Sequence, residues 1–359
     1  MSTEAQATPD PAKAFATKLV KTLNDGALCL MISVGHRAGL YDAISTFYPE
    51  FVSSQALADK AKLNERYVRE WLGAMVVGGI IEYNSESKTY RLPKDHAAFM
   101  VRESGPKNVA IFGQWISLLG SVEDRILECF KNGGGVPHEA YHRVDEVLAE
   151  KSSALIVPVM QEMVVPGIPG LLDKLKKGSK VLDIGCGRGF VMLDLAKRYP
   201  GCTFRGYDYS SKLIADANAD VASLGLANVS FHVQNISKLE EVGEYDVILA
   251  MDVIHHLADP AGALKGANRA LKGDGLFVMQ DVNFSCDVEK NVNQVYGPAL
   301  YADSLLRTMT ISLSEGGLGL GAVWGTEVAQ KMLKENGFNK TEIVVFPEDF
   351  VTCWFVNQK

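Results

Sequence analysis

The residues with the clearest chemical potential lie in the middle of the chain, in Lys180–Gly189 (KVLDIGCGRG). The apolar residues at the start of this stretch predict a buried strand, and Gly185, Gly187 and Gly189 predict a tight turn after it. The apolar residues of Phe190–Tyr199 then recur with helical spacing. A strand, a glycine turn and a helix open nucleotide-binding βαβ units, in which the backbone comes too close to the ligand for most side chains.

Two acidic residues accompany this turn. Asp183 precedes it, and Asp208 ends the next predicted strand, about twenty residues on, where a carboxylate accepts hydrogen bonds from ribose hydroxyls. A dinucleotide fingerprint would require glycine at position 190, where Phe190 stands. A nicotinamide-dependent dehydrogenase is therefore disfavoured, and titration with the competing cofactors would separate the two enzyme classes.

The stretch resembles motif I of the class I S-adenosylmethionine-dependent methyltransferases, V-L-D-x-G-C-G-x-G. The resemblance implies an α/β fold with a seven-stranded, Rossmann-like sheet whose last strand is antiparallel. It implies S-adenosyl-L-methionine as cofactor and S-adenosyl-L-homocysteine as product. The cofactor-binding residues that it implies are Asp183, Gly185, Gly187, Gly189, Asp208, Asn235, Ile236 and Met251. Asn235 replaces the acid that usually meets the adenine amine, and its amide oxygen can accept the same hydrogen bond.

A pair of histidines follows the fourth predicted strand, Tyr245–Ala250. In the plant O-methyltransferases a histidine of this element removes the acceptor's proton, so the resemblance implies that His255 is the catalytic base. The acid that comes next in that family is replaced by His256, which leaves His255 without an acid partner in the sequence.

The nature of the acceptor atom stays open between oxygen and sulfur. A hydroxyl needs a base near neutral pH, whereas a thiol, with a pKa of about 8.5, needs little help. His255 favours O-methylation of a small molecule. S-methylation of a small thiol, and a regulatory protein that binds S-adenosylmethionine without turnover, are the alternatives.

The elements that must position these residues fall into three predicted regions. Residues 1–100 form an α-rich winged-helix dimerisation domain, because a helix-turn-helix pattern over 53–77 precedes two short alternating segments. Residues 101–170 form a helical bridge that caps the pocket, and residues 171–359 form the cofactor-binding domain. A chain of 359 residues is long enough for this division.

Charge and composition narrow the partners. Residues 1–100 hold 11 Lys and Arg against 11 Asp and Glu, and the whole chain has a net charge of −7, which disfavours nucleic acids and anionic membranes. The resemblance implies that the winged helix pairs two subunits into a homodimer. Scattered cysteines, a polar start without an apolar leader, and the lack of a run of about 20 apolar residues predict a cytoplasmic protein.

The acceptor pocket is predicted from aromatic residues of the bridge and of an insertion, Asn283–Val323, whose glycine-rich end predicts a loop that acts as a lid. These segments are poor in charge, which suits a small, largely apolar acceptor. The predicted acceptor contacts are Trp115, Tyr141, His142, His256, Tyr301 and Trp324. No metal is expected, because His138 and His142 have no third ligand at suitable spacing.

Overall fold

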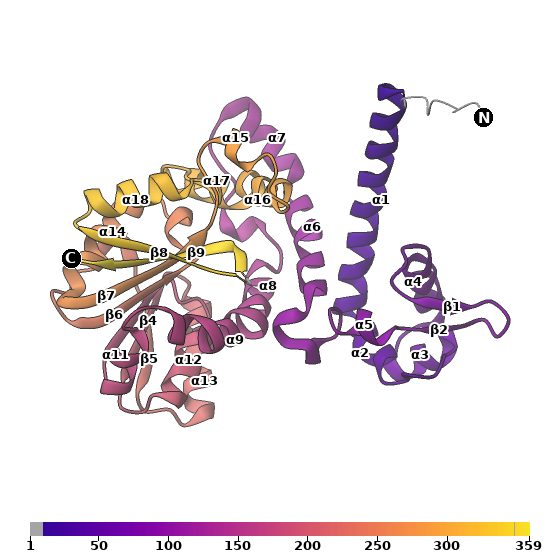
Figure 1. The fold of residues 1–359 in the computed structure, drawn as a ribbon, viewed down its shortest axis with the longest axis horizontal. Coiled ribbons are helices and arrows are strands. Elements are labelled where there is room, and N and C mark those ends of the chain that lie inside the picture. Colours follow the sequence, from indigo (N-terminus) through magenta and orange to yellow (C-terminus); the bar gives the residue numbers. More distant parts are fainter. Residues whose placement is uncertain (1–9, 348) are drawn as a thin grey trace, which may run out of the picture. The chain divides into compact units, whose positions relative to one another are not determined.

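The computed structural model describes residues 10–347 and 349–359, and the chain divides into two compact units, residues 1–117 and 118–359 (Figure 1). The predicted frayed start of the chain (residues 1–12) lies mostly outside the described residues. Among the described residues no single helix is long and apolar enough to cross a membrane; only Val144–Gly167 and Leu171–Lys177 pass such a test together, as a pair bent by 99°.

The first unit confirms the predicted winged helix. Its wing strands pair antiparallel, and Trp71 and Tyr41 meet edge to face in its core. Gly35 and Gly39 predict an interruption of the first helix. At Gly35 this prediction is wrong, because the helix runs on to Arg37, and a Cβ on Gly35 would lie 2.5 Å from the ring of Trp71. Glycine there lets two helices pack closely. The elements are α1 (Pro11–Arg37), α2 (Leu40–Ser45), α3 (Ser54–Ala61), α4 (Glu65–Val77), β1 (Glu82–Asn84), β2 (Thr89–Arg91), α5 (Lys94–Ala97), η1 (Arg102–Lys107) and η2 (Val109–Phe112).

The bridge is more broken than the sequence indicates. The apolar pattern over 109–130 predicts one long face, but α6 (Gly113–Gly120) ends at a turn before α7 (Glu123–Asn132) begins. The sequence also predicts a helix over Asp145–Met163. It is regular only in α8 (Val144–Lys151), after which π-helical turns alternate with short α segments. These segments are η3 (His138–Ala140), η4 (Ser152–Ile156), α9 (Val157–Val159), η5 (Met160–Val164), α10 (Val165–Gly167) and α11 (Leu171–Lys177).

The second unit is built around a seven-stranded sheet in the order β5-β4-β3-β6-β7-β9-β8. The first five of these strands are parallel, and β9 is antiparallel to both of its neighbours, as the sequence predicts. The strands are β3 (Lys180–Ile184), β4 (Thr203–Asp208), β5 (Val229–Val233), β6 (Tyr245–Met251), β7 (Leu271–Val282), β8 (Lys340–Phe346) and β9 (Asp349–Gln358).

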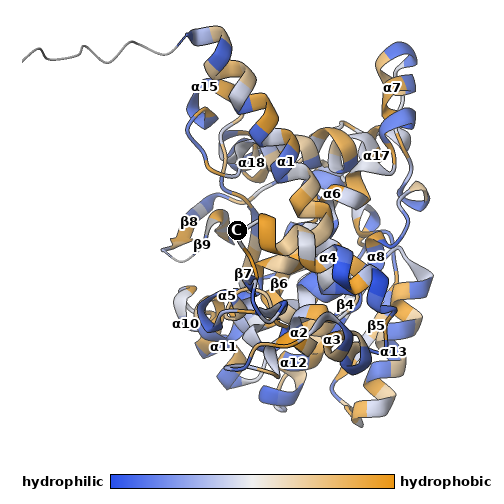
Figure 2. Ribbon diagram, turned by 90° about the vertical axis from the view of Figure 1, so that its right-hand side faces the viewer, coloured by the Kyte–Doolittle hydropathy of each residue, from blue (hydrophilic) through white to orange (hydrophobic). Residues whose placement is uncertain are grey.

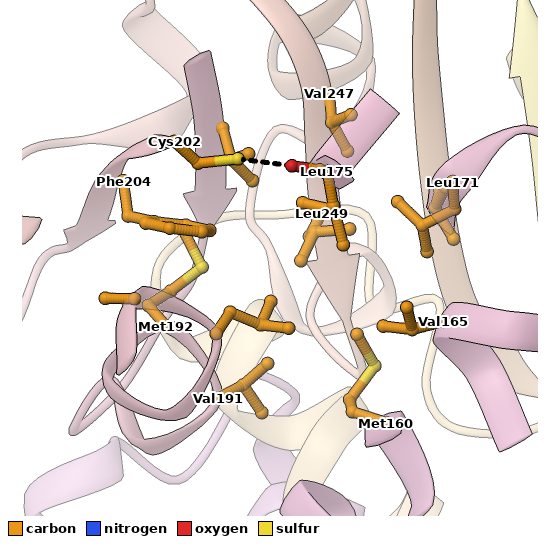
Figure 3. Close-up of a cluster of buried hydrophobic side chains, with 14 of the residues drawn as sticks. Met160, Val165, Leu171, Leu175, Val191, Met192, Cys202, Phe204, Val247 and Leu249 are labelled. Carbon is orange, nitrogen blue, oxygen red and sulfur yellow. Dashed lines mark hydrogen bonds between the residues drawn. The ribbon is translucent and has the colours of Figure 1, made fainter. Parts of the chain in front are cut away.

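Alternate residues of each central strand serve two separate cores. Val247 and Leu249 of β6 pack under α11 and α12 (Phe190–Arg198), in the core that Figure 3 shows, while Ile248 and Ala250 pack under α14 (Pro260–Ala270) and α18 (Thr326–Glu335). A parallel sheet covered on both faces requires such continuous apolar strands. Outside the insertion after β7, this unit also contains α13 (Ser211–Leu224), η6 (Ile236–Lys238) and η7 (Ile254–His256).

The insertion after β7 is a helical subdomain and not only a loop. It contains α15 (Val288–Asn291), α16 (Gly297–Asp303), η8 (Ser304–Thr308) and α17 (Met309–Ser314). The glycine-rich stretch after Ser314 is irregular, as are the short segments 283–287 and 292–296. The insertion was predicted as a loop from its glycine-rich end alone. The glycine content of that stretch says little about the residues before it, which form the helices.

Candidate active site

The glycine turn after β3 adopts the conformation that its sequence predicts. Gly185 and Gly189 have φ of 77° and 72°, and a Cβ at either position would lie 2.3 Å from the side chain of Val253 or Phe231. Any larger residue would therefore be strained and would collide with its neighbour. The turn packs directly against two other strand ends of the sheet.

Asp208, at the end of β4, is tied to this turn. Its Oδ2 accepts a hydrogen bond from the Gly187 amide (2.9 Å), and its Oδ1 accepts one from the Ser210 amide (2.9 Å). Burial raises the pKa of Asp208, and these two amide donors partly offset that shift. Each carboxylate oxygen has two lone pairs, so a ribose hydroxyl can still donate to it.

Asp183 is the least satisfied acid of the turn. Its side chain is 1% exposed, and within the part of the chain that the structure describes its Oδ1 has no hydrogen-bond partner. Burial, with the nearby Asp208 charge, raises the pKa of Asp183 to about 8. A buried carboxyl group without a partner is costly unless a ligand satisfies it.

The strand order reverses between β3 and β6, where ligands bind in open parallel sheets. At this point the glycine turn after β3 contacts the segment that follows β6, because Gly185 lies against Val253. The predicted base, His255, is two residues further on, in η7. The sheet thereby holds the glycine turn and the predicted base together.

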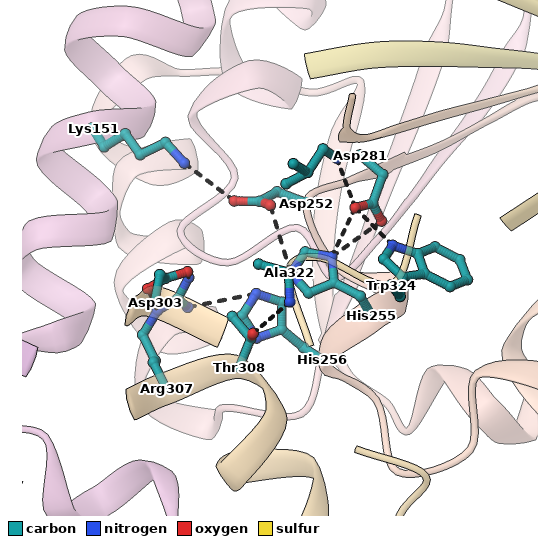
Figure 4. Close-up of polar contacts among 11 residues, drawn as sticks. Lys151, Asp252, His255, His256, Asp281, Asp303, Arg307, Thr308, Ala322 and Trp324 are labelled. Atoms are coloured by element: carbon teal, nitrogen blue, oxygen red, sulfur yellow. Dashed lines mark hydrogen bonds and ion pairs between the residues drawn. The ribbon is translucent and has the colours of Figure 1, made fainter. Parts of the chain in front are cut away.

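His255 is fully buried, and it has an acid partner that the sequence analysis did not find (Figure 4). Its Nδ1 lies 3.0 Å from Oδ1 and 3.1 Å from Oδ2 of Asp281, near the end of β7, while its Nε2 has no hydrogen-bond partner among the described residues. The expectation that His255 lacks an acid partner was wrong, because the partner comes from the neighbouring strand and not from the next residue.

The Asp281 carboxylate sets the protonation of this imidazole. Burial lowers the pKa of His255, but Asp281, with help from Asp252, outweighs burial and holds it above its usual value. Asp281 also accepts hydrogen bonds from Trp324 Nε1 (3.0 Å) and from the Val282 amide (2.7 Å), which fix its position. A proton on Nδ1 leaves Nε2 as a lone-pair acceptor.

A second set of charges surrounds the two histidines. Lys151 of α8 places its Nζ 3.1 Å from Oδ2 of Asp252, and Arg307 of η8 is held by Asp303 through two hydrogen bonds of 2.7 Å. Nη1 of Arg307 lies 3.5 Å from Nε2 of His256. Burial, together with the neighbouring His255 and Arg307, holds the pKa of His256 well below its usual value.

Asp252, His255 and His256 each offer one possible metal-ligand atom, and these atoms lie within 4.8 Å of one another. The surroundings suit a divalent cation poorly. Lys151 already pairs with the carboxylate, and the Arg307 guanidinium faces one of the two imidazoles. Two cations next to the ligand set would repel a third.

The other residues that were predicted to contact the cofactor or the acceptor differ in their exposure and in the unit to which they belong. Asn235 is exposed and uses its side-chain oxygen to cap η6, accepting from the Ser237 amide (3.0 Å), whereas Ile236 is buried and Met251 is half-buried at the end of β6. Trp115 belongs to the first unit, and its role remains a prediction.

The insertion and the loop before α8 are joined by a hydrogen bond and lie beside His255 and His256. The Tyr141 hydroxyl donates to the Leu306 carbonyl (2.6 Å), and the Ser312 hydroxyl donates to the Leu257 carbonyl (2.9 Å). Tyr301 is partly exposed and accepts from Asn291 (3.2 Å), and His142 is exposed.

Three residues around the histidines were not predicted from the sequence: Asp281, Asp252 and Lys151. The first two carried a usable signal, since both stand at the carboxyl ends of predicted parallel strands, where ligand sites form. Lys151 lay in a helix without any distinguishing pattern.

Comparison with known families agrees with this architecture. Residues 26–102 match the family described as the Rv2258c-like winged HTH domain, and residues 175–337 match a family described as a methyltransferase domain. The chain therefore has the class I methyltransferase fold preceded by a winged-helix domain.

Individual relatives are more distant. A ubiquinone biosynthesis O-methyltransferase of Acinetobacter baylyi is 29% identical over 108 residues, which cover 30% of this chain and 44% of that relative, so the match spans less than half of its length. A putative O-methyltransferase of Nostoc punctiforme has a similar structure (TM-score 0.71, 19% identity, 98% of this chain and 100% of that chain). So does human N-acetylserotonin methyltransferase, solved in complex with S-adenosylmethionine (TM-score 0.72, 14% identity, 99% of each chain).

Proposed function

We propose that this protein transfers a methyl group from S-adenosylmethionine to a hydroxyl group of a small molecule, with His255 as the general base. The observation that carries the proposal is the His255–Asp281 pair. A buried imidazole with Nδ1 held by a carboxylate and Nε2 unpartnered is the arrangement of a general base. It lies at the sheet position where the glycine turn would hold the cofactor.

The residues of the turn fit this cofactor. Asp208 would accept hydrogen bonds from the ribose hydroxyls, and the unpartnered oxygen of Asp183 gives a cationic ligand group a counter-charge. When bound, S-adenosylmethionine supplies an electrophilic methyl group. The complex of human N-acetylserotonin methyltransferase with S-adenosylmethionine supports the assignment through the shared fold.

His255 would take the acceptor's proton on Nε2 as the oxygen becomes methylated. Asp281 holds the imidazole in the required tautomer and stabilises the imidazolium that forms. This arrangement favours an oxygen acceptor over a thiol, because only the hydroxyl needs its proton removed near neutral pH. His256, Tyr301 and Trp324 would line the acceptor pocket, with Tyr141 and the insertion covering it.

The test is methyl transfer by the purified full-length chain, measured as S-adenosylhomocysteine release with a panel of small phenols and thiols. We expect turnover with hydroxyl acceptors, and no loss of turnover after treatment with EDTA. Turnover with thiols alone would replace the proposal by S-methylation. Tight binding of S-adenosylmethionine without turnover on any acceptor would favour a regulatory protein.

We further propose a homodimer formed through the N-terminal unit. One face of α1 exposes apolar side chains at helical spacing, and apolar residues recur along the helix in Figure 2. These side chains are Phe15, Leu19, Leu23, Leu30 and Val34. In α4 the arginines pair with glutamates of the same helix, which leaves no basic stripe for nucleic acid.

Light scattering on the full chain tests the dimer. The double variant Leu19→Glu/Leu23→Glu should become monomeric, because the new charges would be buried at the interface. Thr17→Glu, an exposed position on the opposite side of the same helix, should remain dimeric. A monomeric wild-type chain would overturn the proposal.

A further inference from the structure

Asp252 occupies an unusual position beside the proposed base. It directly follows β6 and has a φ of 55°, a left-handed conformation that residues other than glycine rarely adopt. Its amide donates to the Gln280 carbonyl (3.0 Å), which anchors the backbone in this conformation. The side chain is thereby aimed at His255, as Figure 4 shows.

The two residues present two hydrogen-bond acceptors toward the same place. Oδ1 of Asp252 lies 3.9 Å from Nε2 of His255, which is too far for a hydrogen bond between them. Lys151 holds the other carboxylate oxygen, Oδ2, at 3.1 Å. Two acceptor atoms that face one another across such a gap call for a ligand that brings two donor hydrogens.

We propose that Asp252 selects acceptors with two hydrogen-bond donors on adjacent carbon atoms, one of them the hydroxyl that is methylated. Examples are 1,2-dihydroxy and 2-amino-hydroxy aromatic compounds. The inference rests on the proposed O-methylation. The reacting hydroxyl would donate to His255, and its neighbour would donate to Asp252.

The selection has an electrostatic cause. As Nε2 of His255 takes the proton, negative charge develops on the reacting oxygen, close to the ionised Asp252. Two nearby negative charges repel each other in a buried site. A donor hydrogen on the neighbouring group would lie between them and remove the penalty, whereas a lone hydroxyl leaves it in place.

The chemical step balances with these groups alone. The reacting hydroxyl loses its proton to Nε2 of His255 and forms the new oxygen–carbon bond as the cofactor's sulfur–carbon bond breaks. The second donor keeps its hydrogen bond to Asp252 and is not methylated. The proton on His255 passes to solvent after the product leaves.

The experiment compares 1,2-dihydroxybenzene and 2-aminophenol with phenol, 2-methoxyphenol and 1,3-dihydroxybenzene. Methyl transfer is measured with S-adenosylmethionine, and binding is measured by calorimetry on the full chain loaded with S-adenosylhomocysteine. We expect kcat/KM to be at least about tenfold higher for the two compounds with adjacent donors. Asp252→Asn should abolish this preference, so that kcat/KM for 1,2-dihydroxybenzene and kcat/KM for phenol become about equal.

Asp246→Asn is the matched control, because Asp246 also pairs with a lysine (Lys272, 2.7 Å) but stands at the opposite end of β6. It should keep the preference. Equal turnover of phenol and 1,2-dihydroxybenzene by the wild type, or a preference that survives Asp252→Asn, would overturn the inference.

Calorimetric binding of the acceptors distinguishes a failure of this inference from a failure of the proposed function. Selective binding of adjacent donors that depends on Asp252, without methylation, would support the inference and count against O-methylation. Methylation of all the phenols alike would support O-methylation and overturn the inference. Failure of every adjacent donor to bind would also overturn it.

Discussion

The carboxylate of Asp281 lies 3.0 Å from Nδ1 of His255, although the two residues are 26 positions apart in the chain. The sheet brings them together, because His255 follows β6, Asp281 ends β7, and these strands are parallel neighbours. A base in this site thus depends on strand pairing for its orientation.

His255→Ala should lower turnover of a hydroxyl acceptor by roughly 10²–10⁴-fold, the usual contribution of a positioned base. A thiol acceptor should lose far less, and less still as the pH rises toward 9. Steady-state rates with one phenol and one thiol decide the matter. Unchanged turnover on every acceptor would make His255 only part of the pocket wall.

Asp281→Asn should lower kcat by a similar factor and move the acidic limb of the pH–rate profile to lower pH. The Asp281 carboxylate raises the pKa of His255, so its removal lets the imidazole stay neutral at a more acidic pH. Rates from pH 5 to 9, with the affinity for S-adenosylmethionine as control, test this prediction. An acidic limb that does not move would show that another group titrates.

Asp208→Ala should weaken S-adenosylmethionine binding at least about tenfold, because one or two charge-assisted hydrogen bonds of roughly 1.5–3 kcal/mol each are lost. Calorimetry measures the change. Asp274→Ala, which removes an exposed carboxylate at the other end of the sheet, should bind the cofactor normally. Equal affinity in both variants would contradict the assignment of the ribose site.

Asp183→Asn should stabilise the ligand-free protein near pH 8 and weaken cofactor binding. The pKa of Asp183 is about 8 in the folded chain and lower when unfolded. The folded state therefore binds more protons between about pH 4 and pH 8, and stability falls as pH rises through this range. Thermal melts of both proteins at pH 5 and pH 8 measure the difference, which should be larger at pH 8. A variant that melts lower at both values would contradict this account.

The sequence by itself determined the cofactor half of the site. Gly185, Gly187 and Gly189 with Asp208 lie within one βαβ unit, and short-range hydrogen bonds such as that from the Gly187 amide to Asp208 tie them together. Local patterns are sufficient where the contacts themselves are local.

Tertiary structure decided the catalytic half. Asp281 and Arg307 reach the two histidines from a neighbouring strand and from the insertion, and Lys151 reaches the adjoining Asp252 from a helix of the bridge. Asp281 stands at the end of a predicted strand, but nothing in the sequence pairs it with His255. The protonation of the two histidines was equally hidden, because burial and the position of nearby charges set the pKa values of His255 and His256 in opposite directions. Adjacent residues of one type acquired different chemistry because the fold gave one a carboxylate and the other a guanidinium.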